Sequence, residues 1–296
     1  MPSPGEGRRS AWDRWSGMLF IAPYLLLFVL MLVVPLIIGF RLSLTRGDLF
    51  GIRDEVGFEN YGRLFADPVF IQTIWNTLYF VVLTVPSFAI IGLLLALALN
   101  QEARWAAVLR SIFFASTVLS VTVVTLIWRL VFLPEQGLTS VIATAIGAEP
   151  FAFLSSQATA MPAIALVTVW WGIGLPMVLF LAALQQVPKE LYEAAALDGS
   201  SRWQTLRSIT LPSIKRTMVL VIIVEIILQF QLFGQAQLLT NGGPNNSTRP
   251  IVLFIYEAGW KQWQLGYAAA AAQILFAMIA IAAMAQYYVS SRRDAA

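Results

Sequence analysis

Residues 190–212 read ELYEAAALDGSSRWQTLRSITLP, a polar stretch in an otherwise apolar chain. The stretch contains letters at definite distances, in the pattern EAA-x3-G-x9-I-x-LP. These letters fall on Glu193, Ala194, Ala195, Gly199, Ile209, Leu211 and Pro212. For a polar segment, this pattern is unusually definite.

The local chemistry of this stretch predicts a short helix followed by a turn. Pro188 suits a helix start because its missing N–H is not needed there. Glu190 and Glu193 fall in or near the first turn, where negative charge interacts favourably with the helix dipole. Gly199 then ends the helix, as glycine commonly does. A second helix is expected over about 201–209. An amphipathic helix lying on lipid is the alternative interpretation.

Composition decides the class of protein. The chain has 296 residues, of which 58% are hydrophobic and 12% charged, whereas soluble domains are about 25% charged. We therefore predict an integral membrane protein. The sequence has no Cys and no His, which excludes disulfides, thiolate nucleophiles, imidazole bases and the usual zinc sites. The net charge of +3 without a basic stripe does not support nucleic-acid binding.

Apolar windows predict an all-α fold with six transmembrane helices, because about 20 apolar residues cross a bilayer. The windows are Met18–Phe40, Thr73–Leu99, Leu109–Val131, Met161–Leu184, Met218–Leu239 and Tyr267–Tyr288. The first window is longer than the apolar part of a signal peptide, so we interpret it as a retained span. Residues 1–16 are expected to form a tail, and 17–296 a single membrane domain with a loop at about 188–212.

Lys and Arg are unevenly distributed between the two sides of this arrangement, and they accumulate on the cytoplasmic side of membrane proteins. One side carries Arg8, Arg9, Arg14, Arg104, Arg110, Lys189, Arg202, Arg207, Lys215, Arg216, Arg292 and Arg293. The other carries Arg41, Arg46, Arg53, Arg63, Arg129, Arg249 and Lys261. Both termini and the 188–212 loop are therefore predicted to be cytoplasmic.

The EAA pattern resembles the cytoplasmic loop of permease subunits in binding-protein-dependent ABC importers. The run Leu239-Thr240-Asn241-Gly242-Gly243-Pro244 resembles a loop of the maltose, lactose and glycerol-3-phosphate importer group. The resemblance implies a type I importer permease in the bacterial inner membrane. It also implies that an ATPase subunit grips the coupling residues Glu190, Glu193, Ala194, Ala195, Asp198 and Gly199. Its implied partners are a second permease, two ATP-binding subunits and a substrate-binding protein.

The sequence contains no G-x4-G-K-[ST] run, so the chain is not expected to bind ATP and Mg²⁺ itself; partner subunits would do so. No catalytic residues and no metal ligands are predicted. A membrane-embedded enzyme acting on sugar-lipids is the alternative class. Such an enzyme needs clustered acids or metal ligands, whereas the acids of this chain are scattered. ATPase subunits that copurify with the chain would favour the permease.

Sugar contacts are predicted from the same resemblance, by comparison with the maltose permease; those in the fifth span come from aligning back from the LTNGGP loop, and those in the third and fourth spans from the corresponding places. They fall on Thr117, Trp171, Gly172, Glu225, Gln229 and Leu232, with Val121 and Leu175 nearby. Amides and carboxylates bond hydroxyls, and aromatic rings cover sugar faces. The alternative is that these polar groups bond neighbouring helices. No Lys or Arg lies in the middle of a window, which favours a neutral sugar over a phosphorylated polyol such as glycerol 3-phosphate.

Overall fold

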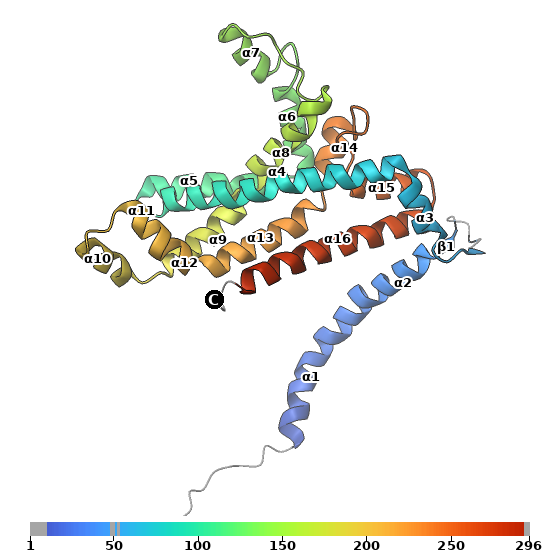
Figure 1. Cartoon of the computed structure of the whole chain (residues 1–296), viewed down its shortest axis with the longest axis horizontal. Helices are drawn as coiled ribbons and strands as arrows, with labels where there is room; N and C mark the ends of the chain where they lie inside the picture. The colour runs from blue at the N-terminus through green and yellow to red at the C-terminus, as the bar shows by residue number, and fades with distance from the viewer. Residues whose placement is uncertain (1–10, 48–50, 52–53, 293–296) are drawn as a thin grey trace, which may run out of the picture.

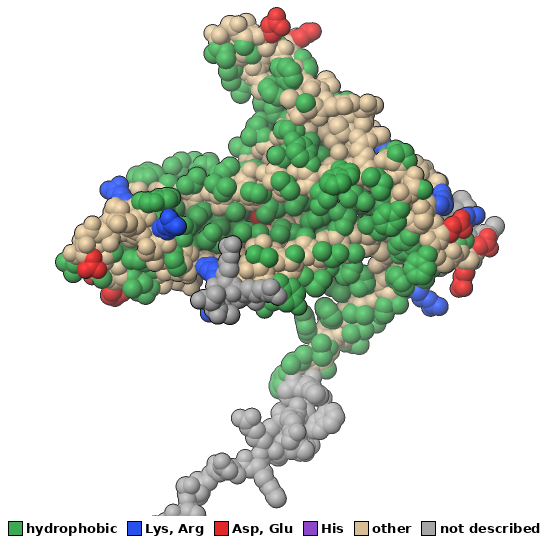
Figure 2. All heavy atoms as spheres, viewed as in Figure 1, with side chains coloured by type: hydrophobic (Ala, Val, Ile, Leu, Met, Phe, Trp, Pro, Cys, Tyr) green, Lys and Arg blue, Asp and Glu red, His purple; other side chains and the backbone are tan. Residues whose placement is uncertain are grey.

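A long central helix organises the fold. In this computed structural model, which describes residues 11–47, 51 and 54–292, helix α4 (Pro68–Leu99) runs alongside α9 (Gly174–Gln185) and α13 (Lys215–Gln229), and α16 (Leu265–Arg292) packs on α13 (Figure 1). Phe80 and Phe88 of α4 and Phe180 of α9 are almost fully buried in the apolar core clusters that these helices form with their neighbours. Large apolar side chains are exposed along the bundle, and many of them are visible on the face drawn in Figure 2, as expected for a bundle surrounded by lipid hydrocarbon.

Three of the predicted windows form continuous helices long enough to cross a bilayer. They are the first span, over Phe20–Ser43, and the helices Pro68–Leu99 and Leu265–Ser290. Helix α4 begins five residues before its predicted window because Asp67 caps it. The Asp67 side chain accepts bonds from the backbone N–H groups of Val69 (2.8 Å) and Phe70 (3.4 Å). These three windows are confirmed as helices. The ends of the helices are set by caps, which a hydropathy pattern does not reveal.

The other three windows are broken, and this corrects the expectation of simple spans. The third contains α5 (Arg104–Ala115) and α6 (Val121–Val131), at 104° to each other. The fourth contains α8 (Gln157–Gly172) and α9, and the fifth contains α13 and α14 (Gly234–Thr240); each pair bends by 48°. If each bent pair counts as one span, the described chain has six.

The first span is anchored at one end and separate at the other. It consists of α1 (Ala11–Phe28), η1 (Val29–Val33) and α2 (Val34–Ser43). Helix α2 packs on α16, whereas α1 diverges from the bundle (Figure 1). The predicted tail 1–16 is helical from Ala11 onward, and residues 1–10 lie outside the described part of the chain.

Short elements complete the chain. At one end of the bundle, β1 (Thr45–Arg46) pairs antiparallel with β2 (Asp54–Glu55), with Thr45 opposite Glu55. The remaining helical segments are α3 (Glu59–Ala66), η2 (Ser116–Val118), α7 (Leu138–Ala145), α10 (Lys189–Leu197), α11 (Arg202–Thr205), η3 (Leu206–Thr210), α12 (Leu211–Ser213), α15 (Ile251–Tyr256) and η4 (Glu257–Lys261). Helix α10 lies at the opposite end of the bundle from β1 (Figure 1).

A buried amide fastens the first span at the β1 end. The Asn60 side chain donates to the carbonyl oxygens of Ser43 and Thr45, both at 2.9 Å. The hydroxyl groups of Ser43 and Tyr61 are 2.7 Å apart and share a hydrogen bond. A Cβ atom on Gly266 would collide with the Thr45 carbonyl, so glycine lets α16 approach this corner.

Candidate functional site

The EAA stretch forms the predicted projecting helix, α10, with its charges directed to solvent. Glu190, Glu193 and Asp198 are exposed, as are Ala194 and Gly199. Ala195 is the buried member of the predicted coupling set. The exposed apolar side chain of Leu197, at 90% exposure, is left at the tip of the helix. A free helix with acids and an uncovered leucine is suited to insertion into a protein groove.

The predicted turn at Gly199 is confirmed. Gly199 has φ +71°, a conformation that glycine adopts without steric cost. The N–H of Ser200 donates to the carbonyl of Ala195 (2.9 Å), and the N–H of Gly199 to that of Ala196 (3.2 Å). This is the Schellman pattern that satisfies the last carbonyls of a helix. The space around Gly199 is open, with no neighbouring atom within 4 Å of a built Cβ, so backbone conformation alone calls for glycine.

The second helix of the stretch is also present and longer than predicted, since helical turns run from Arg202 to Ser213. It opens with a capping box: Ser201 Oγ accepts from the Gln204 N–H (3.3 Å), and Gln204 Oε1 accepts from the Ser201 N–H (2.8 Å). The hydroxyls of Tyr192 and Thr210 lie 3.2 Å apart and link α10 to this helix. Helix α10 is therefore connected by a side-chain hydrogen bond to the segment that leads into α13.

All six residues predicted to contact sugar surround one cavity of about 290 Å³ in the bundle. The cavity is lined by Phe88, Thr117, Thr168, Trp171, Gly172, Leu175, Glu225, Leu228, Gln229, Gln231, Leu232 and Gln235. Amides, hydroxyls, a carboxylate and an indole therefore share one space. Among the described residues that line it, none is Lys or Arg.

Glu225 and Gln229 are two buried polar groups of this cavity. They are one helical turn apart on α13 and only 3% and 7% exposed. The Gln229 Nε2 donates to Glu225 Oε2 at 2.8 Å, which orients both side chains. One carboxylate oxygen and the amide oxygen then remain as acceptors, the chemistry that recognises hydroxyl donors.

The cavity exists because three spans break beside it. Helix α5 ends at Ala115, α8 ends at Gly172 and α13 ends at Gln229. Broken helices of this kind form the substrate sites of many transporters. The freed backbone groups find partners within the protein, as they must in lipid: Trp171 Nε1 donates to the Leu119 carbonyl (3.1 Å), and Ser116 Oγ to the Trp171 carbonyl (3.0 Å).

Two details of the predicted site are wrong. Leu232 was expected in the same continuous span as Glu225 and Gln229, but α13 ends at Gln229, and Leu232 reaches the cavity from the following bend. Val121 does not line the cavity; its side chain packs against Gly234, where a built Cβ would lie 2.9 Å from Val121 Cγ2. Both errors come from assuming unbroken helices.

Residues that were not predicted also line the cavity. Gln231 and Gln235 were not among the predicted contacts, yet they line the same space as Gln229. Thr168 was not predicted; Gln235 Nε2 lies 3.4 Å from its hydroxyl and donates to it. Phe88 from α4 forms another wall, close to Gly172. The pair Gly172 and Gly174 was the available sequence signal for a break in this span.

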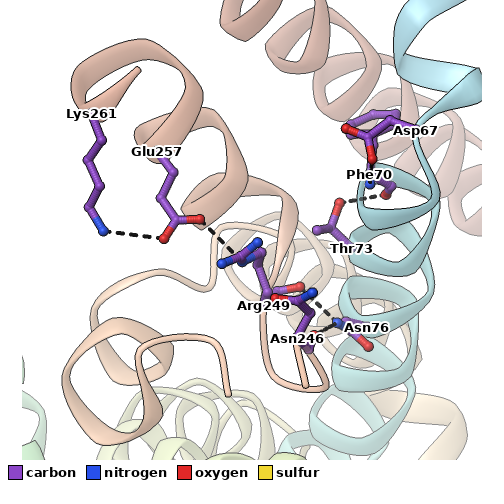
Figure 3. A network of polar contacts seen from close by, with 8 residues as sticks. All are labelled: Asp67, Phe70, Thr73, Asn76, Asn246, Arg249, Glu257 and Lys261. Carbon is purple, nitrogen blue, oxygen red and sulfur yellow. Dashed lines mark hydrogen bonds and ion pairs between the residues drawn. The ribbon is translucent and has the colours of Figure 1, made fainter. Parts of the chain in front are cut away.

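The LTNGGP loop is fastened to α4 rather than free. Asn76 Nδ2 donates to the carbonyl oxygens of Asn246 (2.6 Å) and Arg249 (2.9 Å), as drawn in Figure 3. Thr77 Oγ1 caps α15 by accepting from the Ile251 N–H at 3.0 Å. The loop therefore has a fixed position at the end of α14, next to the cavity-lining segment.

Comparisons with known proteins identify the family to which this chain belongs. The family described as "Binding-protein-dependent transport system inner membrane component" matches residues 62–294. The chain is 34% identical to the multiple sugar-binding transport system permease protein MsmF of Streptococcus mutans, covering 96% of this chain and 98% of the relative. It is 31% identical to the lactose transport system permease protein LacF of Rhizobium radiobacter, with the same coverage.

Solved structures agree on the fold. A bacterial ABC transporter chain involved in importing the acidic polysaccharide alginate superposes with a TM-score of 0.83 at 23% identity, covering 95% of this chain and 96% of that one. This likeness concerns the fold alone. The sequence family, the relatives and the fold agree, and the chain belongs to the family of inner membrane components of binding-protein-dependent transport systems, as a permease subunit rather than an enzyme.

Proposed function

We propose that this chain is the permease subunit of an ATP-driven importer for a neutral saccharide, with the broken-span cavity as its part of the sugar path. The observation that carries this proposal is that six residues predicted from sequence surround one polar and aromatic cavity. Hydroxyls of a sugar would bond the free acceptors of Glu225 and Gln229, and Trp171 would cover a ring face. The names of MsmF and LacF support a sugar as the substrate class.

The charge of the cavity supports a neutral rather than an anionic substrate. Glu225 is buried there, and no Lys or Arg is among the described lining residues. A phosphate or carboxylate on the substrate would meet a like charge without a compensating cation, and desolvated charges need a partner. A phosphorylated polyol would therefore need its cation from a second permease.

Coupling to ATP hydrolysis is the second part of the proposal. Helix α10 would dock into an ATP-binding subunit, with Glu193 paired to a basic residue of that subunit. The exposed acids of α10, its uncovered Leu197 and its hydrogen-bonded link to Thr210 support this role. The chain would then bind no nucleotide itself. The implied assembly contains a second permease, two ATP-binding subunits and a binding protein.

Orientation follows from the same assignment. With α10 in the cytoplasm, the Lys and Arg bias places both termini inside and the LTNGGP loop outside. The native chain has no Cys, so a single cysteine at Asn245 can be labelled without background in intact cells. Labelling from the external side is expected. Labelling only after the cytoplasmic side is opened would invert the arrangement.

Transport in reconstituted vesicles tests the proposed substrate class. The complete importer should take up its radiolabelled saccharide only when ATP and the binding protein are present. Unlabelled lactose or maltotriose is a suitable neutral competitor, and glycerol 3-phosphate is the anionic one. Competition by neutral sugars alone is the expected outcome. Uptake inhibited by glycerol 3-phosphate alone would establish the alternative substrate, and a chain that copurifies with no ATPase would contradict the permease assignment.

A further inference from the structure

A second pocket lies at the β1 end of the bundle, opposite α10, and the sugar path does not use it. Its volume is about 480 Å³. It is lined by Arg46, Gly47, Asp54, Asn60, Arg63, Gln262, Trp263, Gln264, Gly266 and Tyr267. Charged side chains of both signs gather at this end of the molecule, as Figure 2 shows. Under the proposed orientation, this pocket faces the outside.

Trp263 has an unusual backbone conformation in this pocket. Its φ is +59°, where a bulky residue is rarely found. It follows η4 at a position that glycine or asparagine normally occupies. The N–H groups of Gln262 and Gln264, on either side, bond the carbonyls of Glu257 and Ala258, both at 2.9 Å. Neighbouring structure therefore enforces the strained backbone, and strain of this kind is concentrated at functional sites.

The strained backbone presents the indole instead of burying it. Trp263 is 47% exposed. Beside it, the Arg63 guanidinium lies 4.8 Å from the centre of the Tyr267 ring, and Arg63 Nη2 donates to Gln264 Oε1 at 3.4 Å. The Tyr267 hydroxyl donates to Asp67 Oδ2 at 3.1 Å. Arginine, tyrosine and tryptophan are the residue types that dominate binding energy at protein interfaces.

The η4 turn, which ends two residues before Trp263, is held by ion pairs. Glu257 in η4 pairs with Arg249 (3.2 Å) and with Lys261 (3.3 Å), and Arg249 is held on α4 through Asn76, as Figure 3 shows. Rigid mounting lowers the entropy lost on association. These contacts thus hold the segment that leads into Trp263 in place.

We propose that this pocket is the docking site for the substrate-binding protein and that the Trp263 indole is its anchor. The inference rests on the proposed function, which supplies an extracellular protein partner. Tryptophan also anchors helices at the lipid interface, but this one lines a pocket with Arg46, Asp54 and Arg63, and their charges favour a protein surface over acyl chains.

The test uses the complete importer reconstituted in lipid nanodiscs, together with its own saccharide-loaded binding protein. The concentration of binding protein that half-maximally stimulates ATP hydrolysis is measured for Trp263→Ala and Trp263→Gly. Both should raise it tenfold or more and leave basal hydrolysis unchanged. Trp260→Ala is the matched control, because Trp260 is 61% exposed, belongs to η4 and does not line the pocket. It should change the value less than twofold.

Trp263→Gly separates docking from folding, because glycine relieves the left-handed strain. The Gly variant should melt at or above the wild-type temperature while docking weakly. Unchanged docking by both variants overturns the inference, as does an equal loss in Trp260→Ala. Weak docking that follows only a lowered melting temperature, or that changes with lipid composition alone, also overturns it. A wild-type complex that its binding protein fails to stimulate would contradict the proposed function instead.

Discussion

The coupling helix and the broken-span cavity are built on opposite principles. Helix α10 is exposed and specified locally, since each feature of it is explained by a nearby residue: Pro188 before it, Glu190 in its first turn and Gly199 after it. The cavity is buried and is assembled from four separate spans, three of which are broken beside it. The comparison shows that a short sequence motif can specify a contact surface. A transport cavity depends instead on where helices that are distant in the sequence end.

Reversing the charge of Glu193 should produce the largest effect and would break the local side of this comparison. Glu193→Lys replaces the carboxylate proposed to pair with a basic residue of the ATPase subunit by a cation, which that residue would repel. Disrupting a desolvated ion pair costs about 2–5 kcal/mol, which is roughly thirtyfold or more in affinity. The quantity to measure is ATPase subunit retained on the affinity-purified permease, together with uptake.

Glu102→Lys is the matched control for that variant. Glu102 lies at the same end of the bundle, its side chain is 97% exposed, and it is 3.9 Å from Lys189. This control should retain the ATPase subunit. Normal assembly and transport by Glu193→Lys would rule out a docking role for α10.

Removing the amide of Gln229 should produce the next largest effect and tests the cavity. Gln229→Leu keeps a similar volume but removes the donor to Glu225 and the proposed sugar contact. A lost hydrogen bond costs about 0.5–1.5 kcal/mol, and more when a buried partner is left unpaired. We expect transport to fall about fivefold to fortyfold, with basal ATP hydrolysis and the binding protein's own affinity unchanged.

Gln273→Leu in α16 is a suitable comparison for Gln229→Leu, because Gln273 does not line the cavity. It should leave transport near the wild-type rate. A parallel loss of transport and complex stability in Gln229→Leu would show instead that Gln229 holds helices together. Unchanged transport would place the sugar path mainly in the second permease.

The smallest expected effect comes from the turn behind α10. Gly199→Val forces a β-branched residue to φ +71°, and this conformation costs an L-residue about 1–2 kcal/mol. Asparagine tolerates it better, and a Cβ meets no neighbour. ATPase affinity should therefore fall about fivefold or more in Gly199→Val and stay near wild type in Gly199→Asn. An equal loss in both variants would indicate a role for the glycine other than its backbone conformation.

The sequence predicted the locally specified helix α10 better than it predicted the cavity assembled from distant spans. The motif residues of α10 and its glycine turn were predicted, because capping and turn chemistry act within a few residues. Helices α4 and α16 were located because their apolar runs are uninterrupted. The 104° bend between α5 and α6 was not predicted, since Leu109–Val131 is apolar throughout apart from its serines and threonines and the arginines near its ends. Only packing against other spans decides where that helix stops.

Some of the cavity residues were predicted from the sequence, and others were missed. Glu225 and Gln229 were predicted because a carboxylate and an amide are conspicuous in an apolar span. Thr168 and Gln235 were missed as cavity residues, since their positions depend on the 48° bends of the fourth and fifth spans. Trp263 was missed because nothing in its sequence neighbourhood predicts a left-handed tryptophan.

The most direct test of the account asks whether saccharide occupies the cavity during transport. Thr117 lines the cavity, and Thr117→Cys introduces a small thiol into a chain without cysteine. In the reconstituted importer, a hydrophilic maleimide should label this thiol several-fold more slowly when ATP and saccharide-loaded binding protein drive transport than when the saccharide is omitted. Ala158→Cys, exposed outside the cavity, should label equally in both. An unchanged labelling rate at position 117 during active uptake would contradict the assignment of this cavity to the sugar path.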